Sequence, residues 1–365
     1  MARPGAGRSR PEVTTLEPVV LEPNPVHRFY LGGPAISEFR GIPSSDEHAP
    51  EDWVGSATSV FGSPTTGITV LPGGRTLPEA LSADPEAFLG PRHLDRFGAD
   101  PGLLVKLLDA GQRLPVHCHP DRAFARRHLD CPWGKTEGWV ITETRSSDPV
   151  VFLGFRRDID PGALAGWVEG QETETIREAM HRIPVAAGDV FLVPAGIPHA
   201  IGDGIFLVEL QEPTDFSVLL EWAGFDIDGS RDGHLGLGFD VALGCVDRRG
   251  WDEGDTRALR GPRRIGGSRS GVLSLFPAEA DPFFRAERIR PNDVSPLPAG
   301  FSILVVTAGA GRLETGSGAV LGLERGATLL VPHSAGDCAL AGAIEAVRCL
   351  PPDPDAPDDP APAVR

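Results

Sequence analysis

Short apolar segments separated by glycine and proline run through most of this sequence, and they constrain the fold more than any other feature. The segments cover residues 103–108, 114–119, 138–142, 150–155, 189–193, 205–210 and 216–221. Each is of strand length, and turn residues follow within a few positions. The 45 glycines and 36 prolines, with an aromatic fraction of only 7%, favour short strands joined by tight turns over long helices. The sequence therefore predicts a mainly β fold.

A second strand-rich block follows residue 260. Its strand-like segments are 301–307, 311–314, 319–323 and 327–331, and we assign the Gly309-Ala-Gly311 stretch among them to a hairpin turn. The stretch GDVFLVPAGIPH (188–199) aligns without gaps on GATLLVPHSAGD (326–337), with Asp337 in the place of His199. A glycine, an apolar run and a proline also recur by chance in β proteins. If the repeat is real, the second block resembles the first but lacks its histidine.

The length of 365 residues favours about two domains. We expect disordered tails at 1–15 and 351–365, because both are rich in proline and lack apolar periodicity. Residues 16–250 are expected to form a larger domain, with short helices within 77–100 and 160–180. Residues 251–350 are expected to form a smaller β domain.

Charge and cysteine content exclude several classes of protein. The net charge of −17 argues against nucleic acid or an anionic membrane as a partner, and no run approaches the ~18 apolar residues that span a bilayer. The five cysteines are odd in number and widely spaced, and the N-terminal 15 residues contain no apolar stretch. We therefore expect a reduced, cytoplasmic protein. The oligomeric state stays open.

Two histidines alternate in one predicted strand. In GQRLPVHCH (111–119), strand alternation directs His117 and His119 to one face and Cys118 to the other. A lone histidine is more often a surface or core residue than a ligand, so this pair is the stronger indication of a metal site.

Two further segments complete a candidate ligand set. In GKTEGW (134–139), Lys135 and Glu137 share one strand face, although a solvated ion pair would have the same pattern. In GDVFLVPAGIPH, an apolar strand and a Pro/Gly turn present His199. Three imidazole nitrogens and one carboxylate oxygen suit Zn²⁺, and they also accept Fe²⁺, Mn²⁺ or Co²⁺.

These segments resemble the two cupin motifs, G-x5-H-x-H and G-x5-P-x-G-x2-H. Together with HPD (119–121) and GKTE, they identify the chain as similar to the short bacterial form of the type I phosphomannose (mannose-6-phosphate) isomerases. PEDWVGSA (50–57), LLVKLLDA (103–110) and PAGIPHA (194–200) extend the likeness over residues 25–222. The resemblance implies two cupin-like β-barrels of jelly-roll type. It also implies one Zn²⁺ per chain, held by His117 (where the family usually has Gln), His119, Glu137 and His199.

The chain departs from the family further along the sequence. Where the family reads E-x5-D-x3-R, this chain retains Glu209 and Asp215 but carries Leu219 in place of the arginine. Leucine cannot replace a guanidinium that binds phosphate or an oxyanion. We consider Lys106, Arg122 and Arg156 as cations that could compensate.

The resemblance implies isomerisation of mannose 6-phosphate and fructose 6-phosphate through an enediol(ate), with Lys135, Glu209 and Asp215 as catalytic candidates. The substrate partner is then a small sugar or sugar phosphate. Isomerisation of another, unphosphorylated sugar and sugar binding without turnover remain as alternatives.

Overall fold

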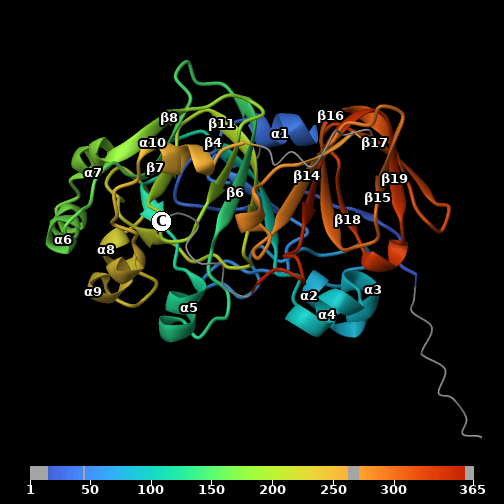
Figure 1. Ribbon diagram of the computed structural model, residues 1–365, viewed down its shortest axis with the longest axis horizontal. Helices are drawn as coiled ribbons and strands as arrows, with labels where there is room; N and C mark the ends of the chain where they lie inside the picture. Colours follow the sequence, from blue (N-terminus) through green and yellow to red (C-terminus); the bar gives the residue numbers. More distant parts are fainter. Residues whose placement is uncertain (1–14, 44–45, 262–270, 358–365) are drawn as a thin grey trace, which may run out of the picture.

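The chain folds into three antiparallel β-sheets with short helices at their edges (Figure 1). The computed structural model describes residues 15–43, 46–261 and 271–357. Strands predominate over helices, so the predicted mainly β class is confirmed. The pairings between the described strands leave each sheet open rather than closed into a barrel.

The first half of the chain forms two sheets that face each other. The six-stranded sheet has the order β2 (Pro25–Val26), β3 (Glu51–Val54), β4 (Leu104–Ala110), β11 (Ile205–Gln211), β6 (Glu137–Thr144) and β9 (Val190–Val193). The five-stranded sheet has the order β12 (Val218–Leu219), β5 (His117–Cys118), β10 (His199–Ile201), β7 (Val150–Phe155) and β8 (Met180–Pro184).

The third sheet forms most of the C-terminal half. Its main path is β1 (Val19–Val20), β18 (Thr328–Val331), β16 (Ser302–Glu314), β19 (Cys338–Leu350), β14 (Arg285–Ile289) and β13 (Val272–Ser274). In addition, β15 (Val294–Leu297) pairs with β19 and β17 (Val320–Glu324) pairs with β16.

Strand alternation explains how the six-stranded sheet is buried on both faces. Along β11, Leu207 packs toward the five-stranded sheet, while Phe206 and Val208 pack toward the C-terminal sheet. Every residue of β4 and β11 is therefore buried, which accounts for their nearly continuous apolar sequences. Any polar side chain that points into the buried interior between the two N-terminal sheets needs a hydrogen-bond or charge partner there.

The helices begin where the sequence supplies N-caps. Thr76, Asp84, Asp121 and Asp160 each accept a backbone N–H at the first turn of a helix. The helices are α1 (Ala35–Arg40), α2 (Leu77–Ala83), α3 (Pro85–Leu89), α4 (Pro91–Phe97), α5 (Arg122–His128), α6 (Pro161–Glu169), α7 (Thr173–Ala179), α8 (Gly229–Asp232), α9 (Phe239–Ala242) and α10 (Glu253–Ala258), with 3-10 turns η1 (Leu243–Cys245), η2 (Ala278–Ala280) and η3 (His333–Ala335). The helices expected within 77–100 and 160–180 are therefore present.

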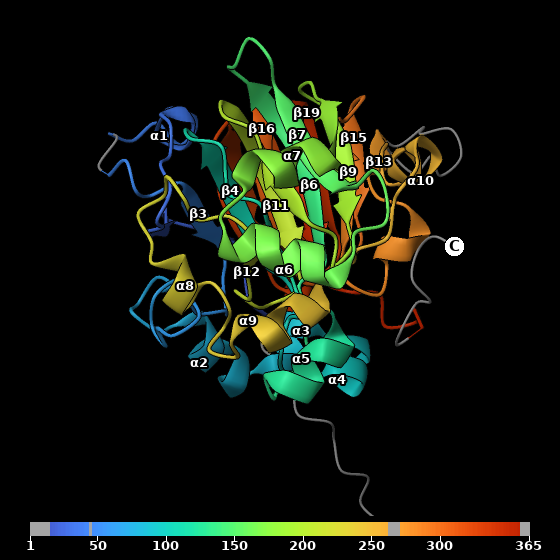
Figure 2. The same ribbon diagram turned by 90° about the vertical axis from the view of Figure 1, so that its left-hand side faces the viewer.

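Helices α6 and α7 cover the outer face of the five-stranded sheet (Figure 2). Leu164 and Ile176 of these helices belong to the same buried cluster as Phe155 and Cys118 of the sheet. Among the described residues, none of the helices combines the length and apolar character that a membrane-spanning helix requires.

Two expectations about local structure are wrong. Gly309-Ala-Gly311 does not form a hairpin turn, because β16 continues through it with a register shift between Val306 and Ala308. Gly309 has φ of +72°, and a Cβ there would overlap the carbonyl oxygen of Ala343 on the paired strand. Glycine at 309 thus allows the close approach of the paired strand just after the irregularity in β16.

The predicted C-terminal tail also begins too early. Pro351 and Pro352 are buried, and the backbone N–H of Asp353 donates to the carbonyl oxygen of Asp281. Prolines lack an N–H donor, so they can pack against the protein without leaving an unpaired group. The remaining tail predictions, for 1–14 and 358–365, fall outside the described residues.

Two contacts shift the expected domain boundaries. Strand β1, assigned to the first domain, pairs with β18 of the C-terminal sheet. Trp251 and Leu259, assigned to the second, pack in the core between the two N-terminal sheets. The two-domain division stays a prediction, and these contacts favour a boundary after residue 260.

Candidate metal centre and active site

A group of charged and histidine side chains lies at one end of the interior between the two N-terminal sheets. Strand alternation that directs Leu108 and Ile141 into this interior also directs Lys106 and Glu137 there. They line a small cavity of about 40 Å³ together with Glu51, Glu209, Lys135, His117, His199 and Leu219.

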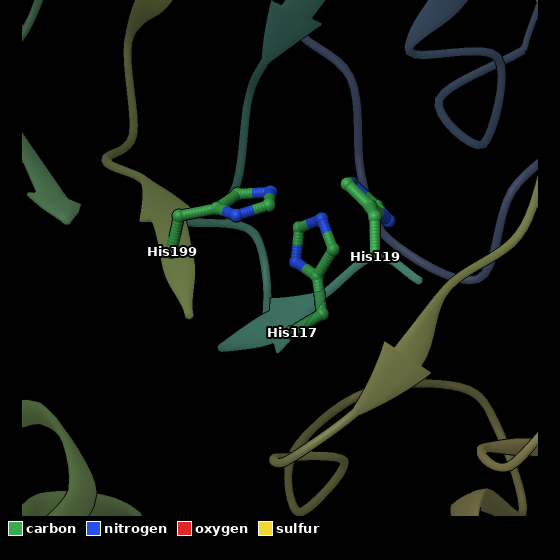
Figure 3. Close-up of side chains that lie close together, drawn as sticks. All are labelled: His117, His119 and His199. Atoms are coloured by element: carbon green, nitrogen blue, oxygen red, sulfur yellow. The ribbon is translucent and has the colours of Figure 1, made fainter. Parts of the chain in front are cut away.

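Three imidazole rings face one another across this interior (Figure 3). His117 on β5 and His199 on β10 are directly paired neighbours, with ring centroids 4.3 Å apart. His119 follows β5, and its ring centroid is 4.9 Å from His117 and 4.8 Å from His199. The candidate ligand atoms lie within 4.8 Å of one another and are buried.

Backbone carbonyls fix the tautomer of all three rings. Nδ1 of His117 is 2.8 Å from the oxygen of Pro115, and Nδ1 of His199 is 2.8 Å from the oxygen of Ile197. Nδ1 of His119 is 2.7 Å from the oxygen of Phe216. A carbonyl only accepts, so each Nδ1 carries the proton and each Nε2 is left unprotonated.

The surroundings also keep these rings neutral. Burial lowers the pKa of His119 to about 3, with a further contribution from the Lys135 charge. Burial likewise lowers the pKa values of His117 and His199. A neutral imidazole with an unprotonated Nε2 is the form that binds a metal.

Glu137 brings a carboxylate to the same point. Its Oε1 is 2.8 Å from Nε2 of His119, and its Oε2 is 3.6 Å from Nε2 of His199. Burial opposes ionisation of Glu137, but the Lys135 ammonium holds the pKa of the carboxyl well below its usual range. The indole N–H of Trp139 donates to Oε2 at 3.0 Å.

The residues present therefore fit a divalent cation. Nε2 of His199 is buried without a hydrogen-bond partner, and the carboxylate of Glu137 faces two acceptor nitrogens. Lys135 Nζ, 3.2 Å from both Glu137 Oε1 and His119 Nε2, offsets part of this negative charge. A cation bound by all four side chains would satisfy acceptors that otherwise face each other.

Glu209 occupies a buried position close to two lysines. Its Oε2 is 3.4 Å from Lys106 Nζ, on the adjacent strand β4. Burial raises the pKa of Glu209 to about 8, and the Glu137 charge adds to this increase while Lys106 opposes it. Glu209 is thus a carboxyl group suited to exchanging a proton near neutral pH.

Asp215, in contrast, is fully engaged. Its two oxygens accept from Nη1 and Nη2 of Arg28 at 3.0 and 3.1 Å, and Oδ2 also accepts the backbone N–H of Phe61 at 3.2 Å. Burial opposes ionisation, but the charges of Arg28 and Lys106 lower the pKa of Asp215. It also lines a separate, larger cavity of about 740 Å³.

Of the three cationic residues considered from the sequence, only one lies at the cavity. Lys106 does line the cavity, where its Nζ is 3.3 Å from Glu51. Arg122 instead donates to Glu212, and Arg156 to the backbone oxygen of Glu178. Neither lines the cavity.

Sequence reasoning missed three residues of this site: Arg28, Tyr30 and Glu51. Glu51 accepts hydrogen bonds from Tyr30 and Trp53, and its Oε1 is 3.4 Å from Arg28 Nε. Glu51 belongs to the PEDWVGSA segment, and the similarity of this segment to the family could have indicated Glu51 as a site residue. Arg28 and Tyr30 belong to no motif.

Comparison with known proteins supports the family indicated by the motifs. No family model matches the sequence. Mannose-6-phosphate isomerase ManA of Bacillus subtilis is 31% identical over 235 residues, which are 62% of this chain and 68% of the relative. Mannose-6-phosphate isomerase of Streptococcus mutans is 29% identical over 203 residues, covering 54% of this chain and 58% of the relative.

Solved structures share the fold. The mannose 6-phosphate isomerase of Bacillus subtilis superposes with a TM-score of 0.67 at 22% identity, covering 92% of this chain and 99% of that one. A putative mannosephosphate isomerase from Archaeoglobus fulgidus gives 0.71 at 18% identity, with coverage of 94% and 100%. The fold, together with the identity and coverage of the Bacillus subtilis relative, leads to one conclusion: this chain belongs to the type I mannose-6-phosphate isomerase family.

Proposed function

We propose that this protein is a metal-dependent aldose–ketose isomerase that interconverts mannose 6-phosphate and fructose 6-phosphate. The observation that carries the proposal is the set of three neutral imidazoles whose Nε2 lone pairs converge beside the Glu137 carboxylate. The choice of substrate rests on relatives that are named mannose-6-phosphate isomerases.

Zn²⁺ is the metal we propose, held by His117, His119, Glu137 and His199. Three nitrogens and one oxygen are a common zinc donor set. A structural neighbour at a TM-score of 0.68 and 15% identity is described as bound with zinc and yttrium. Held by these four side chains, such an ion would supply Lewis-acid catalysis to the reaction.

Glu209 is our choice for the group that moves the proton between the carbons. It lines the cavity, its pKa is raised to about 8, and its carboxyl oxygen is 3.4 Å from the Lys106 ammonium. Asp215 is better suited to positioning, because Arg28 and the Phe61 N–H occupy both of its oxygens.

Lys135 is placed to assist at the reacting oxygens. Its ammonium lines the same cavity within 3.2 Å of Glu137, so it can donate a hydrogen bond to an oxyanion or move a proton between hydroxyl groups. The cavity of about 40 Å³ is far smaller than the ~300 Å³ and more of typical ligand pockets.

A cytoplasmic location fits this proposal. Sugar phosphates are intracellular metabolites, and all five cysteines are free thiols. Neither nucleic acid nor a membrane has a role in the reaction.

The test is an isomerase assay on the zinc-loaded protein with mannose 6-phosphate and with mannose. We expect turnover of mannose 6-phosphate that chelation abolishes and zinc restores. Lys135→Met should lower kcat by ~100-fold while metal content is preserved, because acid–base and oxyanion assistance commonly contribute on this scale. If zinc-loaded wild type converts neither sugar, the isomerase proposal is wrong and sugar binding without turnover takes its place.

A further inference from the structure

The cavity contains a guanidinium group that does not come from the position where the family carries its arginine. Leu219 pairs directly with His117 across β12 and β5, so the two side chains share a face, and both line the cavity. Arg28, from the segment that follows β2, lines the same cavity. The cavity therefore has a leucine at the wall formed by β12, and its arginine comes from the segment that follows β2.

The protein holds the backbone of Arg28 firmly. Its N–H donates to the carbonyl oxygen of His48 at 2.7 Å, and its own carbonyl oxygen lies 2.9 Å from Nδ1 of His48. The guanidinium then meets Asp215 in a two-pronged contact at 3.0 and 3.1 Å. Backbone and side chain are both fixed, so this guanidinium is already oriented before any ligand binds.

Arg28 retains donors for a ligand. Asp215 takes one N–H from each terminal nitrogen, which leaves a second N–H on each. Nε is 3.4 Å from Glu51 and has no hydrogen-bond partner. A guanidinium in this state can bind an additional oxyanion while it keeps its contact with Asp215.

Its position favours the phosphate end of the substrate. The Arg28 side chain is 13% exposed, whereas those of Lys106, Lys135 and Glu209 are 2–4% exposed, so Arg28 lies nearest the solvent. The reacting carbons must reach the histidines, while a strongly hydrated phosphate at the opposite end of the sugar costs least to bind beside the most exposed of these charged groups.

The charge balance also favours a phosphate at Arg28. The cationic side chains of Arg28, Lys106 and Lys135 stand against the carboxylates of Glu51, Glu137 and Asp215, while burial raises the pKa of Glu209 to about 8. A divalent ion at the histidines would make this group net positive, and Arg28 supplies one of its positive charges.

We propose that Arg28 is the specificity-determining residue of this site: it binds the substrate phosphate in place of the arginine that is absent at Leu219. This inference rests on the proposed isomerase function. It assigns phosphate recognition to the N-terminal segment rather than to β12.

The deciding experiment measures kcat and KM for mannose 6-phosphate and for mannose with wild type and Arg28→Lys. Lysine keeps the charge that Asp215 and Glu51 need, but it loses the two-pronged geometry. We expect the KM for mannose 6-phosphate to rise roughly 10-fold or more with kcat changed little. For mannose, kcat/KM should fall by a clearly smaller factor, because a disturbance of Asp215 affects both sugars alike and only mannose 6-phosphate loses a phosphate contact. Inhibition by inorganic phosphate should weaken in parallel with the KM.

Arg113→Lys is the matched control. Arg113 makes the same two-pronged contact, with Glu221 at 2.8 and 2.6 Å, but does not line the cavity. Its substitution should leave the ratio between the two sugars unchanged. Equal losses for both sugars in Arg28→Lys, or the same change of ratio in Arg113→Lys, would overturn the assignment.

A double variant tests whether the guanidinium can be moved. Arg28→Met with Leu219→Arg returns the arginine to the family position, and we expect its preference for mannose 6-phosphate to exceed that of Arg28→Lys. A folded double variant with no greater preference contradicts the proposal. These outcomes presuppose turnover in wild type, whose absence would instead count against the isomerase function.

Discussion

Two of the three histidines are oriented by their own local backbone. His117 and His199 each direct Nδ1 to the carbonyl oxygen two residues earlier, on Pro115 and Ile197. The short spacing within each motif therefore fixes the tautomer as well as the position of the ring. His119 depends on a distant partner, because Phe216 is 97 residues away in sequence. The motifs could reveal the candidate ligands, but not this third orientation.

His119→Ala and His199→Ala should each lower the bound zinc from about one ion per chain to a small fraction. His199 Nε2 is buried without a hydrogen-bond partner, and both variants remove a nitrogen of the candidate ligand group. Elemental analysis of the purified proteins measures this, and circular dichroism should show that the β structure persists.

Cys118→Ser is the control for these variants. Cys118 lies between two proposed ligands, but it points to the opposite face, where its Sγ is 3.5 Å from that of Cys245. We expect zinc content close to wild type. If the serine variant loses as much zinc as His119→Ala, local disturbance next to β5 explains both results and the assignment of His119 as a ligand is wrong.

At the scale of elements, the sequence predicts strands well where both faces of a strand are apolar. The segments at 150–155 and 205–210 correspond to β7 and β11 almost to the residue. The segments at 114–119 and 216–221 contain only the two-residue strands β5 and β12, so apolar alternation overestimated the length of both strands. Arg28 was invisible to sequence reasoning, since its contact with Asp215 spans 187 residues and leaves no local pattern.

One close contact joins a ligand-bearing strand to the C-terminal half. Gly138, next to Glu137 on β6, is buried, and a Cβ there would lie 2.5 Å from the ring of Phe276 and 2.7 Å from that of Phe284. Only a residue without a side chain allows both rings to pack this close to the strand.

Gly138→Ala should therefore destabilise the protein by about 1–3 kcal/mol, because the rings or the strand must shift. Chemical unfolding followed by fluorescence measures this change. Gly322→Ala on β17 is the matched control, since a Cβ there would meet nothing within 4 Å, and its effect should stay within about 1 kcal/mol of zero. Equal stabilities of the two variants would mean that the Phe276 and Phe284 rings move freely.

At the scale of the whole molecule, the proposed metal ligands come from two different sheets. His117 and His199 lie on the five-stranded sheet, while Glu137 lies on the six-stranded sheet, which also packs against the C-terminal sheet. One ion would thus bridge the two N-terminal layers where their interior is least apolar. Without it, neutral nitrogens and a carboxylate face one another with only Lys135 to offset the charge.

Metal removal should consequently lower the melting temperature of the whole protein as well as its activity. A ligand present at ~100 times its Kd stabilises the folded state by ~2.7 kcal/mol, which corresponds to a shift of several degrees. Differential scanning calorimetry of zinc-loaded and chelator-treated wild type measures the difference. The double variant His119→Ala/His199→Ala is the control, and a chelator should leave its melting temperature unchanged. If wild type melts at the same temperature after its zinc has been removed, the ion does not couple the two sheets, because binding to the folded state alone requires a loss of stability when the ion is withdrawn.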